Sequence, residues 1–143
     1  APNVTALIAT GAAVEKAVAA ADLLVGAVLL PGAAAPRVVS RKQVAGMRPG
    51  SVIADISVDQ GGCIETTRAS TYDAPTYVEE GVQHFCVTNM PGAVPRSATQ
   101  ALSAAMLPYL EALLQPDWRN DPRLSAAVNV SGGEVVLAAL RGD

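Results

Sequence analysis

Short apolar segments punctuate the first 90 residues and have the length of strands. They are Val4–Ala9, Leu23–Leu30, Ser51–Ile56 and Val82–Val87. The segment after Asp22 is apolar on both faces, which is typical of a strand buried on both sides of a parallel sheet. Between the last two segments, the chain is polar and glycine-rich, and we expect a loop there.

Two segments between these strands favour helices. Residues 12–21 are rich in alanine, and residues 41–47 follow Ser40, which can cap a helix. When helices alternate with strands over short turns, successive strands are parallel and joined by right-handed crossovers. We therefore predict an α/β fold, a partial Rossmann-type doubly wound parallel sheet followed by C-terminal helices.

The pattern changes after the proline- and glycine-containing segment 91–95. Apolar residues recur at helical spacing from residue 97, where Ser97 and Thr99 can cap a helix that Pro108 should kink or split. A turn and a short helix are expected over 117–124, and a closing segment over 128–140, broken at Gly132-Gly133. The predicted division is therefore an α/β part over residues 1–92 and a helical part over residues 93–143.

Composition narrows the possible partners. The 143 residues are 50% hydrophobic and only 16% charged, with a net charge of -3 and a mean hydropathy of +0.30. Without a basic stripe we expect no nucleic-acid partner, and without an apolar run of about 18 residues we expect no membrane span. The chain opens without Met and without the features of a signal peptide. We expect a cytoplasmic protein whose chain begins inside a larger architecture or was trimmed.

Three of the predicted strands end in unusual loops. In an open α/β sheet, ligands bind beyond the carboxyl ends of the strands, so these loops predict a site. Asp59 precedes Gly61-Gly62 in one loop, and Asn89 begins another. Asp59 either contacts a bound ligand or satisfies the backbone of its own loop, and Asn89 either binds a ligand or belongs to an ordinary proline turn.

The other reactive residues favour structural roles. Cys86 lies within a strand and is expected to be buried, whereas Cys63 follows the glycine pair and is expected to be more exposed. His84 is interpreted as a structural histidine, and Glu79-Glu80 as a solvated pair. We find no metal-ligand cluster, no G-x-G-x-x-G segment and no P-loop in the sequence.

Three long segments resemble signatures of the alanine dehydrogenase and NAD(P) transhydrogenase alpha family. They are Leu24–Pro36, Met47–Cys63 and Asn89–Pro95, in the family's order and approximate spacing. Ser70–Asp73 lies between the last two, and Asn129–Val135 resembles the family's closing segment. Within the family, Asp59 and the Pro31–Ala33 segment look more like alanine dehydrogenase than the NAD-binding component of transhydrogenase.

The resemblance implies NAD-dependent oxidative deamination of L-alanine to pyruvate and ammonia, and the reverse reaction. Carried over by motif, Asp59 would be the catalytic carboxylate and would border the nicotinamide. The implied cofactor-binding residues are Val28, Leu29, Ile56, Asp59, Val87, Thr88, Asn89 and Met90. The partners would be the small-molecule substrate, L-alanine or pyruvate, and further copies of the chain in a homo-oligomer.

Several parts of the family's site have no counterpart in these residues. The glycine-rich phosphate loop, the acidic ribose-binding residue, the substrate-binding lysine and arginine and the catalytic histidine lie upstream of the match in the family. We therefore expect no detectable turnover by the 143-residue chain alone. The alternatives are an inactive truncated relative acting as an assembly or weak nucleotide-binding module, and a transhydrogenase-like NAD-binding domain. The helix from residue 97 would pack toward the substrate domain in the family.

Overall fold

The computed structural model describes residues 3–141 of the chain. These residues form two compact units, Ala1–Asn89 and Met90–Asp143, called here the first and the second unit. The family resemblance implies that residues 1–92 are the second half of an NAD-binding domain and that residues 93–143 return toward the substrate domain, and this assignment stays a prediction.

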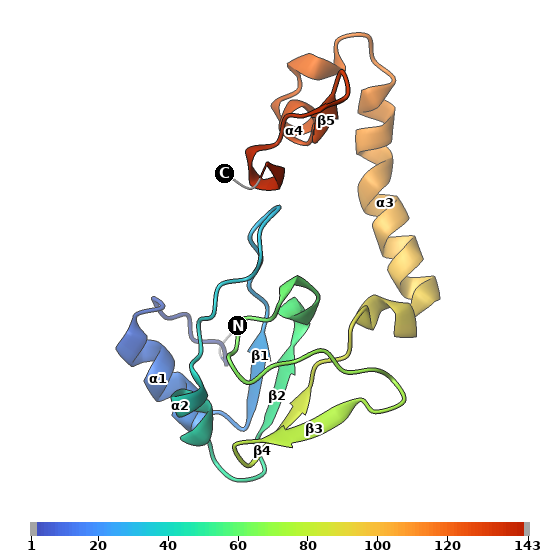
Figure 1. Cartoon of the computed structure of the whole chain (residues 1–143). Coiled ribbons are helices and arrows are strands. Elements are labelled where there is room, and N and C mark those ends of the chain that lie inside the picture. The colour runs from blue at the N-terminus through green and yellow to red at the C-terminus, as the bar shows by residue number, and fades with distance from the viewer. Residues whose placement is uncertain (1–2, 142–143) are drawn as a thin grey trace. The chain divides into compact units, whose positions relative to one another are not determined.

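A four-stranded sheet organises the first unit (Figure 1). Its strands are β1 (Leu23–Gly26), β2 (Val52–Asp55), β3 (Thr76–Glu79) and β4 (Val82–Phe85), in the order β1-β2-β4-β3. β1, β2 and β4 are parallel, with Leu24 opposite Ile53 and Ile53 opposite His84. The predicted α/β class with a parallel sheet is confirmed.

The polar segment that was expected to be a loop contains β3, which pairs antiparallel with β4. The turn between them is Glu80-Gly81, and both residues have positive φ, 53° and 76°. A two-residue turn with this backbone suits the twist of a hairpin, and glycine adopts it without strain. The expectation was wrong because the alternation in Thr76–Glu79 is short and follows a long irregular segment.

Two other strand predictions need correction. Residues 4–10 are not a strand, and Val4, Leu7 and Ile8 are exposed, because no neighbouring strand pairs with them. β1 is not buried on both sides: Leu23 is 60% and Val25 49% exposed. These two side chains alternate with Leu24 and therefore point to the face of the sheet opposite the core.

The core lies on the sheet face that carries Leu24, Ile53 and Val82. Two predicted helices contribute to it, α1 (Gly11–Ala20) through Val18 and α2 (Arg41–Ala45) through Val44. Both helices begin at a side-chain cap. Thr10 accepts from the amide of Ala13, and Ser40 and Gln43 form a capping box. The two helix predictions are confirmed.

The second unit is helical at its start and irregular at its end. After a 3₁₀ turn over Met90–Ala93, its elements are α3 (Pro95–Leu113), a 3₁₀ turn over Trp118–Asn120, α4 (Pro122–Ala126), β5 (Val130–Ser131), β6 (Glu134–Val135) and a 3₁₀ turn over Ala138–Leu140. β5 and β6 form a hairpin about Gly132-Gly133, where the closing segment was expected to break. The turn and short helix expected over 117–124 are also present.

α3 differs from its prediction in two respects. It begins at Pro95 after Val94, with no side-chain cap, because proline at the first helical position needs no partner for an amide proton. Pro108 does not split it, and the helix continues to Leu113. Within the described part of the chain, no helix is long and apolar enough to cross a membrane.

Candidate functional site

The loops that follow β1 and β2 enclose a pocket at the carboxyl edge of the sheet. The pocket has a volume of about 240 Å³ and is lined by Ala27, Val28, Leu29, Ile56, Ser57 and Gln60. Three of the predicted cofactor residues, Val28, Leu29 and Ile56, therefore lie together around one cavity. Its walls are mostly apolar, and the Ser57 hydroxyl donates to the carbonyl of Val28 at 2.9 Å, which ties the two loops to each other.

A second cavity of about 430 Å³ lies next to residues of the same loops. It is lined by Leu29, Leu30, Gly32, Ala33, Ala34 and Gln60. Leu29 and Gln60 line both cavities. Gln60 was not among the predicted site residues, and its position next to the Gly61-Gly62 pair was the signal that could have identified it.

Asp59 links the loop after β2 to the loop after β4. It lies in the 3₁₀ turn Ile56–Gln60, is exposed to solvent, and both of its carboxylate oxygens lie 3.1 Å from the backbone nitrogen of Asn89. The alternative in which Asp59 satisfies only its own loop is not what the structure shows, because Asn89 is 30 residues away in sequence. The remaining carboxylate surface of Asp59 is open to a ligand.

Residues 87–90, which follow β4, are also predicted to bind the cofactor, but their side chains differ in how far they are exposed. Val87 is only 1% exposed, so its side chain lies inside the protein, and its neighbours bond to Ser70. Thr88 is half-buried and Asn89 is exposed with φ of 52°, a left-handed conformation that asparagine tolerates. Met90 begins the second unit. Of the described residues that line the two cavities, none comes from this segment, and its predicted role in binding stays a prediction.

Cys63 is not exposed as expected, because its side chain is 1% exposed and packs below the loop that follows β2. Burial raises the pKa of the Cys63 thiol, which disfavours the nucleophilic thiolate. Cys86 is buried in the first unit, as predicted, and burial raises its pKa as well. Neither cysteine is placed or ionised as a nucleophile would be.

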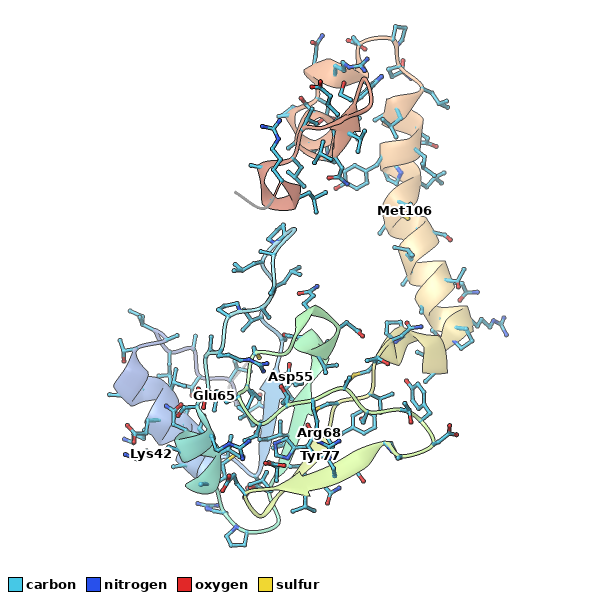
Figure 2. All side chains as sticks on the ribbon, viewed as in Figure 1. Lys42, Asp55, Glu65, Arg68, Tyr77 and Met106 are labelled. Carbon is cyan, nitrogen blue, oxygen red and sulfur yellow. The ribbon has the colours of Figure 1, made fainter. Side chains whose placement is uncertain are left out.

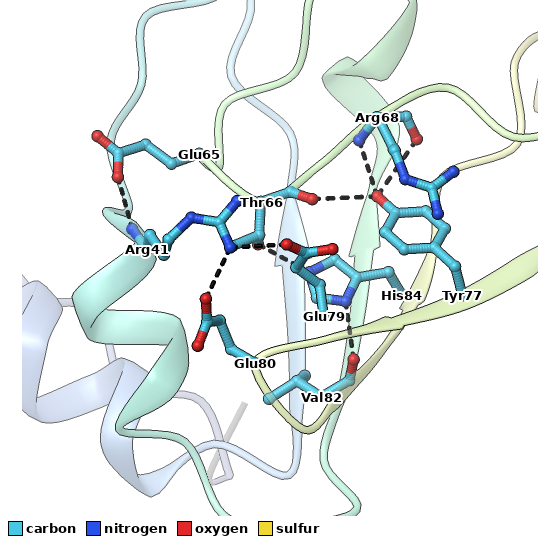
Figure 3. A network of polar contacts seen from close by, with 9 residues as sticks. All are labelled: Arg41, Glu65, Thr66, Arg68, Tyr77, Glu79, Glu80, Val82 and His84. Atoms are coloured by element: carbon cyan, nitrogen blue, oxygen red, sulfur yellow. Dashed lines mark hydrogen bonds and ion pairs between the residues drawn. The ribbon is translucent and has the colours of Figure 1, made fainter.

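His84 is a fully buried structural residue, in agreement with its interpretation from the sequence (Figure 3). Its Nδ1 lies 2.9 Å from the carbonyl oxygen of Val82, which can only accept, so Nδ1 carries the proton. Its Nε2 then accepts from the hydroxyl of Thr66 at 2.8 Å. Burial lowers the pKa of His84 below 6.5, and the imidazole is neutral in this setting.

Tyr77 and Arg68 complete a stack on His84 that sequence reasoning missed. The rings of Tyr77 and His84 lie opposite each other on β3 and β4, with centroids 5.0 Å apart and an interplanar angle of 18°. The guanidinium of Arg68 lies 3.8 Å from the centroid of the Tyr77 ring. The missed strand β3 explains the missed stack, because only that strand brings Tyr77 to His84.

Glu79 and Glu80 are not merely solvated (Figure 3). Arg41 at the start of α2 lies 2.7 Å from a Glu79 oxygen and 2.6 Å from a Glu80 oxygen. Its hydrogen bond lowers the pKa of Glu79. The backbone amide of Arg41 donates to Glu65 at 2.6 Å. These contacts join the start of α2 to the β3–β4 hairpin.

The described residues offer no metal centre. Over residues 3–141, no three or more histidine, cysteine, aspartate or glutamate side chains are grouped so that they could hold a metal ion.

A parallel sheet with an apolar cavity at the carboxyl ends of its strands defines this part of the molecule as a Rossmann-like α/β domain. Residues 1–138 match the family model described as "Alanine dehydrogenase/PNT, C-terminal domain". The chain belongs to this family, which confirms the resemblance seen in the three sequence segments.

Curated relatives agree with this assignment. Alanine dehydrogenase of Halomonas elongata is 46% identical over 138 residues, which cover 94% of this chain and 37% of that protein. Alanine dehydrogenase of Methanococcus maripaludis is 45% identical over 143 residues, which cover 96% of this chain and 38% of that protein. The chain thus spans little more than a third of the length of these relatives.

Solved structures give the same result. An L-alanine dehydrogenase superposes with a TM-score of 0.74 at 46% identity, over 93% of this chain and 38% of the other. A transhydrogenase from Sinorhizobium meliloti superposes with a TM-score of 0.69 at 29% identity, over 91% of this chain and 36% of the other.

Proposed function

We propose that this chain forms part of the active site of an NAD-dependent alanine dehydrogenase. The reaction would be the reversible oxidative deamination of L-alanine to pyruvate and ammonia. The observation that carries the proposal is the cavity lined by Val28, Leu29 and Ile56, with the exposed carboxylate of Asp59 on the same 3₁₀ turn as Ile56. Its supporting context is the identity of 43% to 48% to curated alanine dehydrogenases.

The cavity fits the part of NAD that reacts. The faces of a nicotinamide ring are flat, and the apolar side chains of Val28, Leu29 and Ile56 form walls against which such a ring can pack. When bound, NAD would accept a hydride from the substrate carbon. The apolar residues would keep water away from that transfer and hold the ring in one orientation.

Asp59 would act on the substrate's nitrogen. An ionised carboxylate beside the reacting carbon stabilises a cationic ammonium or iminium group and can hold a proton during the reaction. The Asn89 amide fixes one side of the carboxylate, which leaves the other side for the substrate. Thr88, Asn89 and Met90, with the backbone of Val87, would form the opposite wall.

A chimera tests this function directly. We would replace the matching segment of Halomonas elongata alanine dehydrogenase with this chain, which is 46% identical to it. The chimera should reduce NAD with L-alanine, and Asp59→Asn should lower kcat by about 10²- to 10⁴-fold. Asp73→Asn, at an exposed position, is the matched control and should leave kcat near the parent value.

Other outcomes of this experiment discriminate between functions. An active chimera in which Asp59→Asn has no effect would contradict the role of Asp59. A folded chimera that binds NAD without oxidising L-alanine would favour the transhydrogenase-like alternative, which the structural match at 29% identity supports. The unmodified 143-residue chain should produce no detectable NADH from L-alanine, and measurable production would overturn that expectation.

We further propose that the protein acts in the cytoplasm as a homo-oligomer. The supporting observation is the apolar surface of α3, where Leu102, Met106 and Leu110 are exposed (Met106 is labelled in Figure 2). Sedimentation of the chain should show self-association that Leu102→Glu and Leu110→Glu weaken. A monomer at all concentrations would contradict the proposal.

A further inference from the structure

Asp55 is a fully buried carboxylate at the last position of β2 (Figure 2), and neither cavity is lined by it. Burial of an ionised carboxylate is costly unless hydrogen bonds replace its hydration. Asp55 accepts three short bonds: from the Ser57 amide at 2.9 Å, from the Cys63 amide at 2.8 Å and from the Thr67 hydroxyl at 2.8 Å. These three donors replace the hydration that the Asp55 carboxyl group loses on burial, so the role of Asp55 in the fold is to accept hydrogen bonds.

Two glycines close the space around this carboxylate. A Cβ atom at Gly26 of β1 would lie 2.8 Å from one Asp55 oxygen, and a Cβ atom at Gly62 would lie 2.9 Å from the other. Gly62 also has φ of 80°, which favours glycine. The backbone at Gly26 and at Gly62 therefore approaches the Asp55 carboxyl group so closely that a side chain at either position would collide with it.

The donors of Asp55 bracket the segment that carries Asp59. Ser57 lies in the first turn of the 3₁₀ segment Ile56–Gln60, and Cys63 lies just after that segment ends. Asp55 thus binds the backbone near the start of the seven-residue loop 56–62, at Ser57, and just after its end, at Cys63. The site residues Ile56, Asp59 and Gln60 all lie on this loop.

The loop that follows β1 is tied to the same place. Arg37 donates to the Ile64 carbonyl and lies 3.4 Å from the Thr67 hydroxyl that donates to Asp55. In the backbone, the Ala35 amide donates to the Gln60 carbonyl at 2.9 Å. Both loops that line the cavities are therefore held against each other around Asp55 and Thr67.

We propose that Asp55 is a positioning residue for the candidate active site. Its carboxylate fixes the loop 56–62 so that the Asp59 side chain meets the Asn89 amide. The relevance of this geometry to catalysis rests on the proposed function. The geometry itself is a property of the chain, and it is tested without cofactor.

The Asn89 amide provides the readout, because its proton points at the Asp59 carboxylate. In NMR spectra of the 143-residue chain, the Asp59→Asn variant serves as the reference: it gives the chemical shift of the Asn89 amide when the contact with the Asp59 carboxylate is lost. Asp55→Asn should move the Asn89 amide resonance more than half of the way toward that position. The amide resonances of Tyr77 and His84, which lie in the sheet outside the loop, should stay in place.

Hydrogen exchange gives a second readout at the loop itself. The Cys63 amide donates to an Asp55 carboxyl oxygen at 2.8 Å, and loss of this buried bond should speed its exchange about 10- to 100-fold. An Asn89 resonance that keeps its native position in a folded Asp55→Asn chain would overturn the proposal. A purely stabilising Asp55 would speed exchange throughout the first unit and leave the Asn89 position unchanged.

Thr67 supplies variants for the case in which Asp55→Asn does not fold. Thr67→Val removes one donor to Asp55 and should shift the Asn89 amide in the same direction by a smaller amount. Thr67→Ser keeps the hydroxyl and should restore the native position. Equal Asn89 shifts in both Thr67 variants, or none in either, would contradict the proposal. If the chimera lacks activity while these shifts occur, the proposed function fails and the positioning role stands.

Discussion

The two units of this chain differ in how many of their residues are buried. The first unit contains nearly all of the buried residues, including a cluster around Ile53 and Val44 and the buried polar residues Asp55 and His84. Among residues 90–141, only Leu124 is buried, and most apolar residues of α3 are exposed. The sheet unit is stabilised by packing between distant segments, whereas the helical unit relies mainly on local hydrogen bonds.

The buried polar groups show why this difference matters for the site. No buried side-chain nitrogen or oxygen of the described residues lacks a hydrogen-bond partner. In the first unit, these partners lie far apart in sequence, as with Thr66 and His84 or Thr67 and Asp55. A site needs fixed distances between loops, and the first unit supplies them through such contacts.

The largest expected effect comes from the core of the sheet. Ile53 is fully buried, and Ile53→Ala should lower the free energy of unfolding by about 2–5 kcal/mol through lost burial and a cavity. Leu110 on α3 is exposed, and Leu110→Ala should change it by less than about 1 kcal/mol. Urea unfolding of the two variants measures both, and equal losses would erase the distinction between the units.

A comparison of two glycines with positive φ distinguishes the cost of backbone strain from the cost of steric crowding. Gly62 and Gly132 have φ of 80° and 60°, but only Gly62 has atoms where a Cβ would lie. Gly62→Ala and Gly132→Ala should each lower the free energy of unfolding by about 1–2 kcal/mol, because alanine is strained in a left-handed backbone conformation. For Gly62→Ala, the free energy of unfolding should fall by about 1–3 kcal/mol more, because the added methyl group overpacks against Asp55. Urea unfolding tests this, and similar losses would show that the Asp55 environment can relax.

The units should also respond to acid in different ranges of pH. Burial lowers the pKa of His84, so the unfolded chain binds more protons than the folded chain just below pH 6.5. The free energy of unfolding should therefore fall as the pH falls from 6.5 toward the lowered pKa. His84→Gln should remove this slope, which unfolding at several pH values would reveal. A slope that persists in the variant would point to another group.

In the second unit, the corresponding group is Asp121. Its hydrogen bond with Arg123 lowers its pKa from 3.8 to about 2. This contribution is present above pH 3.8 and is lost as the pH falls through about 2. Arg123→Ala should weaken it, because the side-chain hydrogen bond is lost while the backbone amide of residue 123 still donates to Asp121. Asp121 also caps α4 through the Arg123 amide, so helix signals from circular dichroism in this range are a suitable measurement.

The smallest effects are expected from the exposed ion pairs. Arg41 bridges Glu79 and Glu80 in the first unit, and Arg123 pairs with Asp121 in the second. Near neutral pH, each arginine-to-alanine change should leave the free energy of unfolding almost unchanged, because solvent screens exposed ion pairs, and the effect should be smaller still in high salt. A large loss for Arg41→Ala alone would show that the hairpin depends on this bridge.

Local patterns predicted the parts of the fold that local forces decide. The cap at Ser40, the alternation of strands and helices and the break at Gly132-Gly133 follow from neighbouring residues. β3 was missed because a four-residue strand becomes stable only when β4 pairs with it. Val4–Ala9 failed for the opposite reason, since an apolar segment without a pairing strand does not form one.

The site divides in the same way. The sequence indicated the family, and the resemblance implied that Val28, Leu29 and Ile56 bind the cofactor; these three residues do lie around one cavity. Only the tertiary structure decided that Cys63 is buried, that Asp59 meets Asn89, and that Asp55 faces inward between Gly26 and Gly62. These facts depend on contacts between residues far apart in the chain, and such contacts leave no periodic signal in the sequence.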